Sequence, residues 1–390
     1  MKNPNVPYIG LFSLFFINSA VAFFGLTVYL LLKHENKAFL RFWAVLGVLF
    51  VSLFCATKVP ESDLEVYIIY YHEATDTPFS DYLGILWGKE PLYLAICYGL
   101  NMLFMDNEKL FVFMLSIISL GLLLGSFFMV EKKIRLRQSE FVLAVCLMLF
   151  FPFFFGQAVH VVRQTMAFSL FIYAFSLRFF SDRKWIWLIG LASPFIHSSC
   201  LLFIPFLFFP ALNRPIRGKM CVLYGFVIAA LASIQLLAAY LLPFISNESL
   251  QYAFKRASED TTFESRLNTY QVVITGFLGL LPPLYYYIIK KPRGKDYIYC
   301  LVNFFFIVEV FVLLATGQLE LQARFNMVMF QSLALIAILF FRMKQLPPMV
   351  LNILSVLIIM VYFYYQLYVS PWEFECMDLF LVYPLPLYLI

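Results

Sequence analysis

The sequence has 390 residues, of which 63% are hydrophobic and only 13% are charged, and its net charge is +5. Apolar runs of about 20 residues, long enough to cross a bilayer, recur along the chain and exclude a soluble protein. A transmembrane β-barrel would show shorter segments of alternating hydrophobicity. The positive charge is spread between the apolar runs, which indicates membrane topology rather than nucleic-acid binding. We therefore expect an all-α, polytopic transmembrane helical bundle.

Six cationic connections separate the apolar runs, at Lys33–Arg41, Lys132–Arg137, Arg183–Lys184, Arg214–Lys219, Lys290–Lys295 and Arg342–Lys344. Short cationic loops mark the cytoplasmic side of a membrane, so we place all six there. This topology predicts about ten full spans and puts both termini outside. The expected spans are about 8–32, 39–56, 110–130, 140–160, 164–180, 220–245, 268–289, 297–316, 325–341 and 346–369.

We expect residues 1–390 to form a single integral membrane domain. The longest external segment is 57–109, and its short apolar stretch Pro91–Met105 predicts a re-entrant or interfacial helix. A second, shorter external loop is predicted at 246–267. The first apolar run, Tyr8–Leu32, is too long for the core of a cleavable signal peptide.

The apolar stretch Trp185–Leu212 has cations at both ends, so an even number of crossings must lie between them. We expect two half-length helices that meet near Pro194–Ser199, with His197 at their tip in the outer half of the membrane. The same topology places Arg163 at the external mouth of the helix 164–180. Charges are costly in lipid and usually face a cavity or a partner. Arg163 and His197 are therefore predicted to share one external site.

The residue types on this face are suited to diphosphate chemistry. Arginine binds phosphate as a planar fork, and a histidine or a carboxylate can accept a proton from an attacking hydroxyl. No C-x-x-C, H-E-x-x-H or Cys/His cluster predicts a metal, and no cofactor is expected. These features favour the displacement of a pyrophosphate from a sugar by a hydroxyl group, with arginines that stabilise the leaving group.

Structural interpretations of the same residues stay open at this point. Arg163 could extend towards external headgroups, and Arg324 could be a similar anchor at the start of a late helix. His197 could cap the tip of its hairpin. Asp63 is equally typical of the charged first turn of a helix.

An ordered series of segments resembles the EpsG-like, Wzy-type polysaccharide polymerases. The resemblance implies a GT-C-like membrane glycosyltransferase of the bacterial inner membrane, with its active site facing the periplasm or exterior. It leaves open whether the product is O-antigen, capsule or exopolysaccharide. The segments are Ser62-Asp63-Leu64-Glu65-Val66-Tyr67, Glu90-Pro91-Leu92-Tyr93, Val162-Arg163-Gln164-Thr165-Met166-Ala167, Ala192-Ser193-Pro194-Phe195-Ile196-His197-Ser198-Ser199, and Arg324.

The resemblance implies a donor glycan on undecaprenyl diphosphate and an acceptor hydroxyl on a lipid-linked repeat unit. The other partners expected are the lipid bilayer and a chain-length regulator. No nucleic-acid partner is expected. A flippase for the same lipid-linked glycan, or a ligase with a different acceptor, is the alternative. We predict catalytic roles for Arg163, His197, Asp63 and Arg324. We predict substrate-binding roles for Gln164, His160, Ser198, Glu90, Glu65 and Arg266.

Overall fold

The computed structural model describes residues 6–85, 90–182, 185–215, 281, 284–285, 288, 298–315, 319–370 and 373–375. All regular elements in these ranges are helices, and one isolated bridge joins Lys58 to Phe374. The apolar composition of the long helices fits a membrane bundle, which confirms the predicted fold class.

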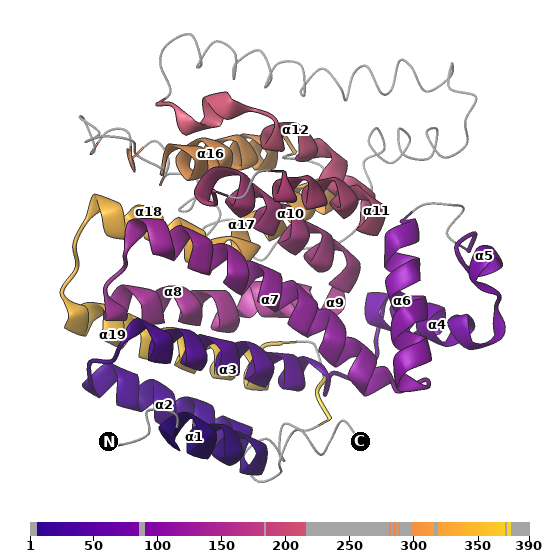
Figure 1. Cartoon of the computed structure of the whole chain (residues 1–390), viewed down its shortest axis with the longest axis horizontal. Helices are drawn as coiled ribbons and strands as arrows, with labels where there is room; N and C mark the ends of the chain where they lie inside the picture. Colours follow the sequence, from indigo (N-terminus) through magenta and orange to yellow (C-terminus); the bar gives the residue numbers. More distant parts are fainter. Residues whose placement is uncertain are drawn as a thin grey trace. The chain divides into compact units, whose positions relative to one another are not determined.

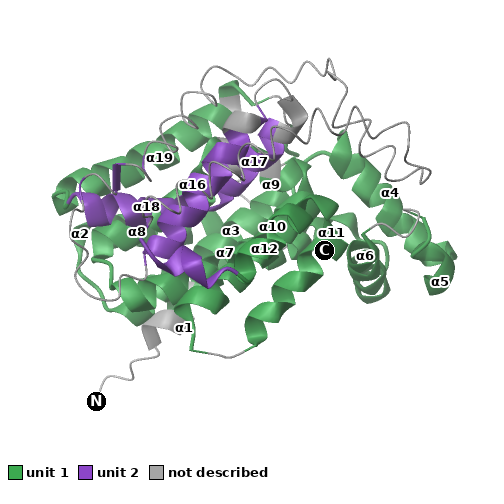
Figure 2. Cartoon of the chain, turned by 90° about the horizontal axis from the view of Figure 1, so that it is seen from above, with its two compact units in different colours: residues 1–208, 345–390 green, residues 209–344 purple. Residues whose placement is uncertain are grey.

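The chain divides into two compact units (Figure 2), residues 1–208 with 345–390 and residues 209–344. Unit 2 contains η3 (Pro210–Asn213), α16 (Tyr299–Leu314), α17 (Leu319–Gln331) and α18 (Leu333–Met343). Unit 1 contains α1 (Val6–Ile17), α2 (Ser19–Leu32), α3 (Lys37–Cys55), α4 (Asp63–Asp76), α5 (Phe79–Tyr82), α6 (Pro91–Phe104), α7 (Glu108–Ile134), α8 (Gln138–Phe150), α9 (Pro152–His160), α10 (Val162–Phe180), η1 (Ile186–Ala192), α11 (Ser193–Ile196), η2 (Ser198–Leu202), α12 (Ile204–Leu207) and α19 (Pro348–Tyr368).

Polar and proline residues divide several of the expected spans. The Asn18 side chain accepts a hydrogen bond of 2.9 Å from the Val21 N–H and begins α2, which splits the predicted span 8–32 into two helices. Pro152 begins α9, because proline lacks an N–H and is tolerated only in the first turn of a helix. The predicted span 140–160 is therefore two helices, α8 and α9.

Three helices in the described ranges, α3, α7 and α19, are long and apolar enough to cross a membrane. The count rises to four if α17 and α18, which meet at an angle of 63°, form one broken span. The predicted spans 220–245 and 268–289 lie wholly or largely outside the described residues. The count of about ten spans stays a prediction.

Unit 1 is built around α3, which packs against α2, α7 and α8, while α8 packs against α19 (Figure 1). Phe23 of α2 stacks on Trp43 and Phe50 of α3, with ring centroids 5.6 Å and 5.4 Å apart. The buried Trp43 indole donates a 3.0 Å hydrogen bond to the Thr27 hydroxyl, so its only polar atom has a partner.

A buried carboxylate ties the end of α7 to the start of α3. Glu131 accepts from Lys37 at 2.5 Å and from Arg41 at 3.0 Å. Two cations around one buried anion compensate the cost of removing that anion from water. Loss of both cations would leave the buried carboxylate of Glu131 unpaired.

Gly47 allows α3 to approach α2 and α8 closely. A Cβ atom at this position would lie 2.6 Å from Leu149 Cδ1 and 2.8 Å from Phe23 Cε2. We predict that Gly47→Leu destabilises the protein by about 1–3 kcal/mol through overpacking. The thermal unfolding midpoint of the purified protein in detergent, followed by size-exclusion chromatography, measures this effect.

Gly25→Leu is the matched control, because no atom lies within 4 Å of a Cβ atom built there and Gly25 is exposed on α2. Equal midpoints for the two variants would contradict the packing described for α3.

Candidate active site

Glu90 lies at the centre of the candidate site and immediately precedes α6. Its Oε2 accepts a 2.7 Å hydrogen bond from Arg163 Nη1, and its Oε1 accepts one of 3.2 Å from the Ser198 backbone N–H. The backbone of Glu90 is left-handed, with φ 57° and ψ 43°, which is costly for a residue with a Cβ atom. Backbone strain of this kind is often found at functional sites.

Arg163, the second residue of α10, is held by Glu90 and by two aromatic rings. Its guanidinium carbon lies 4.8 Å from the centroid of the Tyr67 ring and 5.6 Å from that of Tyr93. Cation–π contacts at such distances stabilise a cation, the more so when water is excluded. Side-chain exposure is 20% for Arg163 and 10% for Glu90. Arg163 is thus a confined cation, rather than one extended towards lipid headgroups.

The Nε atom of Arg163 is buried and has no hydrogen-bond partner among the described residues. The buried Tyr93 hydroxyl beside it has the Cys97 thiol, a weak hydrogen-bonding group, as its partner. Buried polar groups normally have partners, so the unsatisfied N–H of Arg163 indicates a site adapted to a polar ligand.

His197 approaches Glu90 from the other side. Its Nδ1 accepts a 3.3 Å hydrogen bond from the Ser199 backbone N–H and lies 2.7 Å from the Ser199 hydroxyl oxygen. A neutral imidazole that accepts at Nδ1 carries its proton on Nε2. That Nε2 lies 3.9 Å from Glu90 Oε1. His197 therefore both caps η2 and directs an N–H towards the carboxylate.

Short elements bring these residues together from distant parts of the sequence. The helix α11 packs against both α6 and α10, so its C-cap His197 comes close to Glu90 and Arg163. Gly190 lets the preceding element η1 pack closely against α10 and α12, because a Cβ atom there would lie 2.7 Å from both Ala174 Cβ and Leu207 Cδ1.

The expectation of two half-length helices in Trp185–Leu212 differs from the structure. The described part of this stretch folds as five short elements, η1, α11, η2, α12 and η3. Pro194 and Pro205 each lie in the first turn of a new helix, and proline cannot continue the helix that precedes it. The Gly190 carbonyl at this break accepts from the Ser193 backbone N–H and also from the Ser193 hydroxyl, at 2.7 Å.

The other predicted residues of unit 1 surround this cluster at different depths. Asp63 and Glu65 are exposed in the first turn of α4, the helix that carries Tyr67. His160 is half-buried at the end of α9. Gln164 is buried, and its Nε2 has no partner among the described residues. Ser198 contributes its backbone N–H to Glu90.

Two predicted residues lie elsewhere. Arg324 is half-buried on α17 in unit 2, and Arg266 lies outside the described residues. Their roles stay predictions. Tyr67 and Tyr93 were not predicted as site residues, although Tyr67 comes four residues after Asp63 and Tyr93 three after Glu90. The signal that could have identified them is an aromatic residue three or four positions after an acidic residue at the start of a helix.

A polar network fastens α4, and with it Tyr67, to the junction of α6 and α7. His72 contacts Asp106 through Nδ1 at 3.1 Å and Glu108 through Nε2 at 2.7 Å. Thr75 donates to Asp106 at 2.8 Å, and Asn101 donates to Asp106 at 2.5 Å and to the Tyr71 carbonyl at 2.9 Å. The network joins three helices by side chains that are mostly half-exposed.

The charge of His72 determines the strength of this network. Burial lowers the pKa of His72, but its hydrogen bonds to Glu108 and Asp106 outweigh burial and leave the pKa raised. The hydrogen bond from Thr75 is the largest cause of the lowered pKa of Asp106, so that carboxylate stays ionised. The contribution of His72 is fully present below its ordinary pKa of about 6.5 and is lost as pH rises through its raised folded-state pKa.

We predict that wild-type α4 exchanges amide hydrogens more slowly than α4 of His72→Gln at low pH, and that this difference disappears above the raised pKa. Hydrogen–deuterium exchange of both proteins at each pH measures it, since the intrinsic exchange rates then cancel. The exchange of α8, which His72 does not contact, is the internal control. A difference in α4 that does not depend on pH would contradict a role for the charge.

Comparison with known proteins places the chain in a family. The family model described as the EpsG family matches residues 41–384, which is most of the chain. No curated protein and no solved structure matches the chain significantly. The matched range includes Glu90, Arg163 and His197. The chain therefore belongs to the EpsG family, an EpsG-like polysaccharide polymerase family.

Proposed function

We propose that this membrane protein is a glycosyltransferase that extends a polysaccharide on the external face of the bacterial inner membrane. The donor is a growing glycan on undecaprenyl diphosphate, and the acceptor is a hydroxyl group of one lipid-linked repeat unit. The acceptor oxygen bonds to the anomeric carbon of the donor while the bond to the diphosphate oxygen breaks. Both electrons of that bond leave with the diphosphate, and a protein side chain takes the hydroxyl proton.

The single observation that carries this proposal is the confined Arg163–Glu90 pair. Without substrate, Glu90 balances the charge of Arg163. A diphosphate offers more negative charge and several oxygens in the geometry of the guanidinium fork, so it competes with Glu90 for Arg163. The Tyr67 and Tyr93 rings hold the guanidinium plane during this exchange. Arg163 then stabilises the charge that develops on the leaving diphosphate.

The same exchange supplies a base. Once the diphosphate occupies Arg163, the Glu90 carboxylate loses that hydrogen bond, and its Oε2 is free to accept the hydroxyl proton. The Nε2–H group of His197, whose nitrogen lies 3.9 Å from Glu90 Oε1, can hold either that carboxylate or the acceptor oxygen in position. Donor binding thereby activates the group that receives the acceptor proton. Asp63 is exposed at the start of α4 and is the second candidate base.

We predict that Arg163→Ala lowers polymer formation by about 100- to 1,000-fold, since one stabilising group at a developing charge has roughly this effect. Arg163→Lys keeps the charge but loses the planar fork, and should recover only a small part of the activity. The glycan ladder of deletion cells complemented with each variant is the measurement. Arg342→Ala, an exposed arginine at the end of α18, is the control.

Long chains at normal protein level in Arg163→Ala cells would contradict the assignment. Repeat units trapped on the inner leaflet would favour a flippase instead. Loss of glycan attachment with unchanged chain length would favour a ligase.

Glu90→Gln separates base chemistry from donor binding. The amide keeps its size and can still accept from the Ser198 N–H, but it cannot take a proton at neutral pH. We predict that this variant binds undecaprenyl diphosphate glycan at least as well as wild type, while turnover falls about 100- to 10,000-fold. Binding and single-turnover transfer by the purified protein distinguish these effects. Weaker donor binding with unchanged turnover would contradict the competition between Glu90 and the diphosphate.

A further inference from the structure

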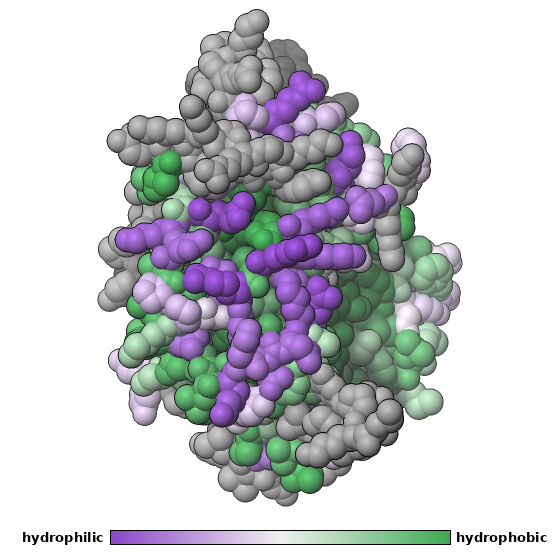
Figure 3. Space-filling view, turned by 60° about the vertical axis from the view of Figure 1, so that its left-hand side comes forward, coloured by the Kyte–Doolittle hydropathy of each residue, from purple (hydrophilic) through white to green (hydrophobic). Residues whose placement is uncertain are grey.

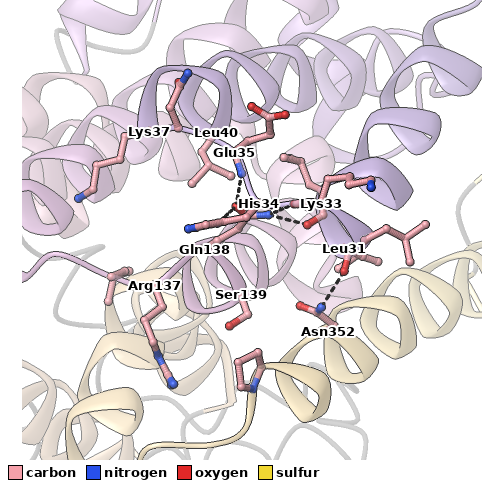
Figure 4. Close-up of a pocket in the computed structure, with 15 residues that line it drawn as sticks. Leu31, Lys33, His34, Glu35, Lys37, Leu40, Arg137, Gln138, Ser139 and Asn352 are labelled. Carbon is pink, nitrogen blue, oxygen red and sulfur yellow. Dashed lines mark hydrogen bonds between the residues drawn. The ribbon is translucent and has the colours of Figure 1, made fainter.

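A cavity of about 660 Å³ lies in unit 1 where the turn between α2 and α3 meets the start of α8 (Figure 4). Its polar wall comes from the cationic connections that the topology assigns to the cytoplasmic side. It shares no lining residue with the cluster around Glu90. Figure 3 shows hydrophilic side chains gathered over the face on which these connections lie.

The wall of the cavity is held by one side chain of α8. Gln138 Nε2 donates to the carbonyls of Leu30 and Lys33, both at 2.6 Å. Gln138 Oε1 accepts from the Glu35 N–H at 2.8 Å and lies 2.7 Å from His34 Nδ1. All four hydrogen-bonding directions of the amide are used, so the turn is a preformed wall rather than a loose loop.

Cations outnumber carboxylates among the residues that line the cavity. The cations Lys33, Lys37 and Arg137 line the cavity, and Glu35 is its one acidic lining residue. Lys37 pairs with Glu131, which Arg41 also contacts, and Arg137 pairs with Glu140 at 2.6 Å. Lys33 is exposed and forms no ion pair within the ranges that the structure describes. Its charge is therefore available to a ligand.

An apolar groove continues directly from the polar cavity. This groove has a volume of about 530 Å³ and shares the lining residues Leu31, Leu32 and Asn352 with the cavity. Asn352 Nδ2 donates to the Leu31 carbonyl at 3.1 Å, so this residue lies at the border between the polar and apolar parts. The groove then follows exposed apolar side chains of α19, among them Met349, Ile353 and Leu357. Most of the apolar window of α19 is left unburied by the protein.

We propose that this cavity and groove bind one anionic phospholipid. The headgroup phosphate occupies the cavity beside Lys33, and one acyl chain lies along α19. A free phosphate would leave the apolar groove unused, and a neutral lipid would leave the charge of Lys33 unused. Only an amphipathic anion matches both parts in the order in which they adjoin. The site is separate from the proposed transfer reaction and does not depend on it.

Native mass spectrometry of the full chain, released from detergent with dioleoyl phosphatidylglycerol or dioleoyl phosphatidylcholine, tests the proposal. We expect phosphatidylglycerol to bind more tightly than phosphatidylcholine. Lys33→Gln should weaken phosphatidylglycerol binding about fivefold, since one cation near an anionic headgroup contributes roughly this much. Ile353→Trp should weaken both lipids by filling the groove. Lys33 is the cation chosen for substitution, because Lys37 and Arg137 form ion pairs with Glu131 and Glu140 and their removal would break those pairs.

Two matched controls address general effects. Lys132→Gln removes one exposed positive charge at the end of α7 without touching the cavity, and Val361→Trp enlarges an exposed residue of α19 beyond the groove. Both should bind phosphatidylglycerol as wild type does. Size-exclusion profiles identify any variant that fails to fold. If Lys33→Gln fails to fold, Lys33→Arg, which keeps the charge, replaces it in the test and must bind phosphatidylglycerol as wild type does.

Competition distinguishes the possible occupants. Inorganic phosphate and glycerol phosphate should not displace phosphatidylglycerol, and displacement by either at equal concentration would make this a simple phosphate site and overturn the proposal. Tighter binding of undecaprenyl phosphate, lost in Lys33→Gln, would likewise overturn it in favour of the polyprenyl carrier. If Lys33→Gln and Lys132→Gln weaken phosphatidylglycerol binding equally, the lipid is attracted by the general positive charge of the surface and not by this site, which would also overturn the proposal.

Discussion

The ion pair between Arg163 and Glu90 is the interaction on which the candidate site depends. Both side chains are nearly withdrawn from solvent, in a chain with few charges to place there. A confined guanidinium is tolerable because a carboxylate and two aromatic rings surround it. Tyr67 lies on α4, Glu90 and Tyr93 lie at the start of α6, and Arg163 lies at the start of α10, so all three helices must be in place before the pair can form. The short elements α11 and η2 then complete the site, because they place the Ser198 N–H and the His197 imidazole beside Glu90.

The sequence was informative wherever a residue was costly in its own surroundings. Arg163 and His197 were predicted as site residues for this reason. Arg163 is a cation at the start of an apolar helix, and His197 lies in an apolar stretch that a proline interrupts; both features are visible without a structure. Glu90 was placed only among the substrate-binding residues. Its central position depends on α11 packing against α6, a contact between segments about a hundred residues apart that no local pattern encodes.

The helix boundaries show the same limit. Asn18 and Pro152 interrupt apolar runs whose hydropathy predicts one continuous helix, because capping and ring geometry act on single residues and barely change a window average. The 3₁₀ segments that position His197 arise from closely spaced prolines and from the contact at Gly190, where tertiary packing overrides local preference. No local pattern shows that Tyr67 and Tyr93 face a cation, and only the fold reveals their contacts with Arg163.

The amide of Gln138 has a consequence for how the protein is made. Its hydrogen bond to Lys33 joins residues 105 positions apart, yet it satisfies carbonyls at the end of a helix hairpin that is synthesised much earlier. Until α8 has been synthesised, these carbonyl groups must find other partners, such as water. We therefore expect the turn between α2 and α3 to reach its final form only after a segment from the middle of the chain has arrived.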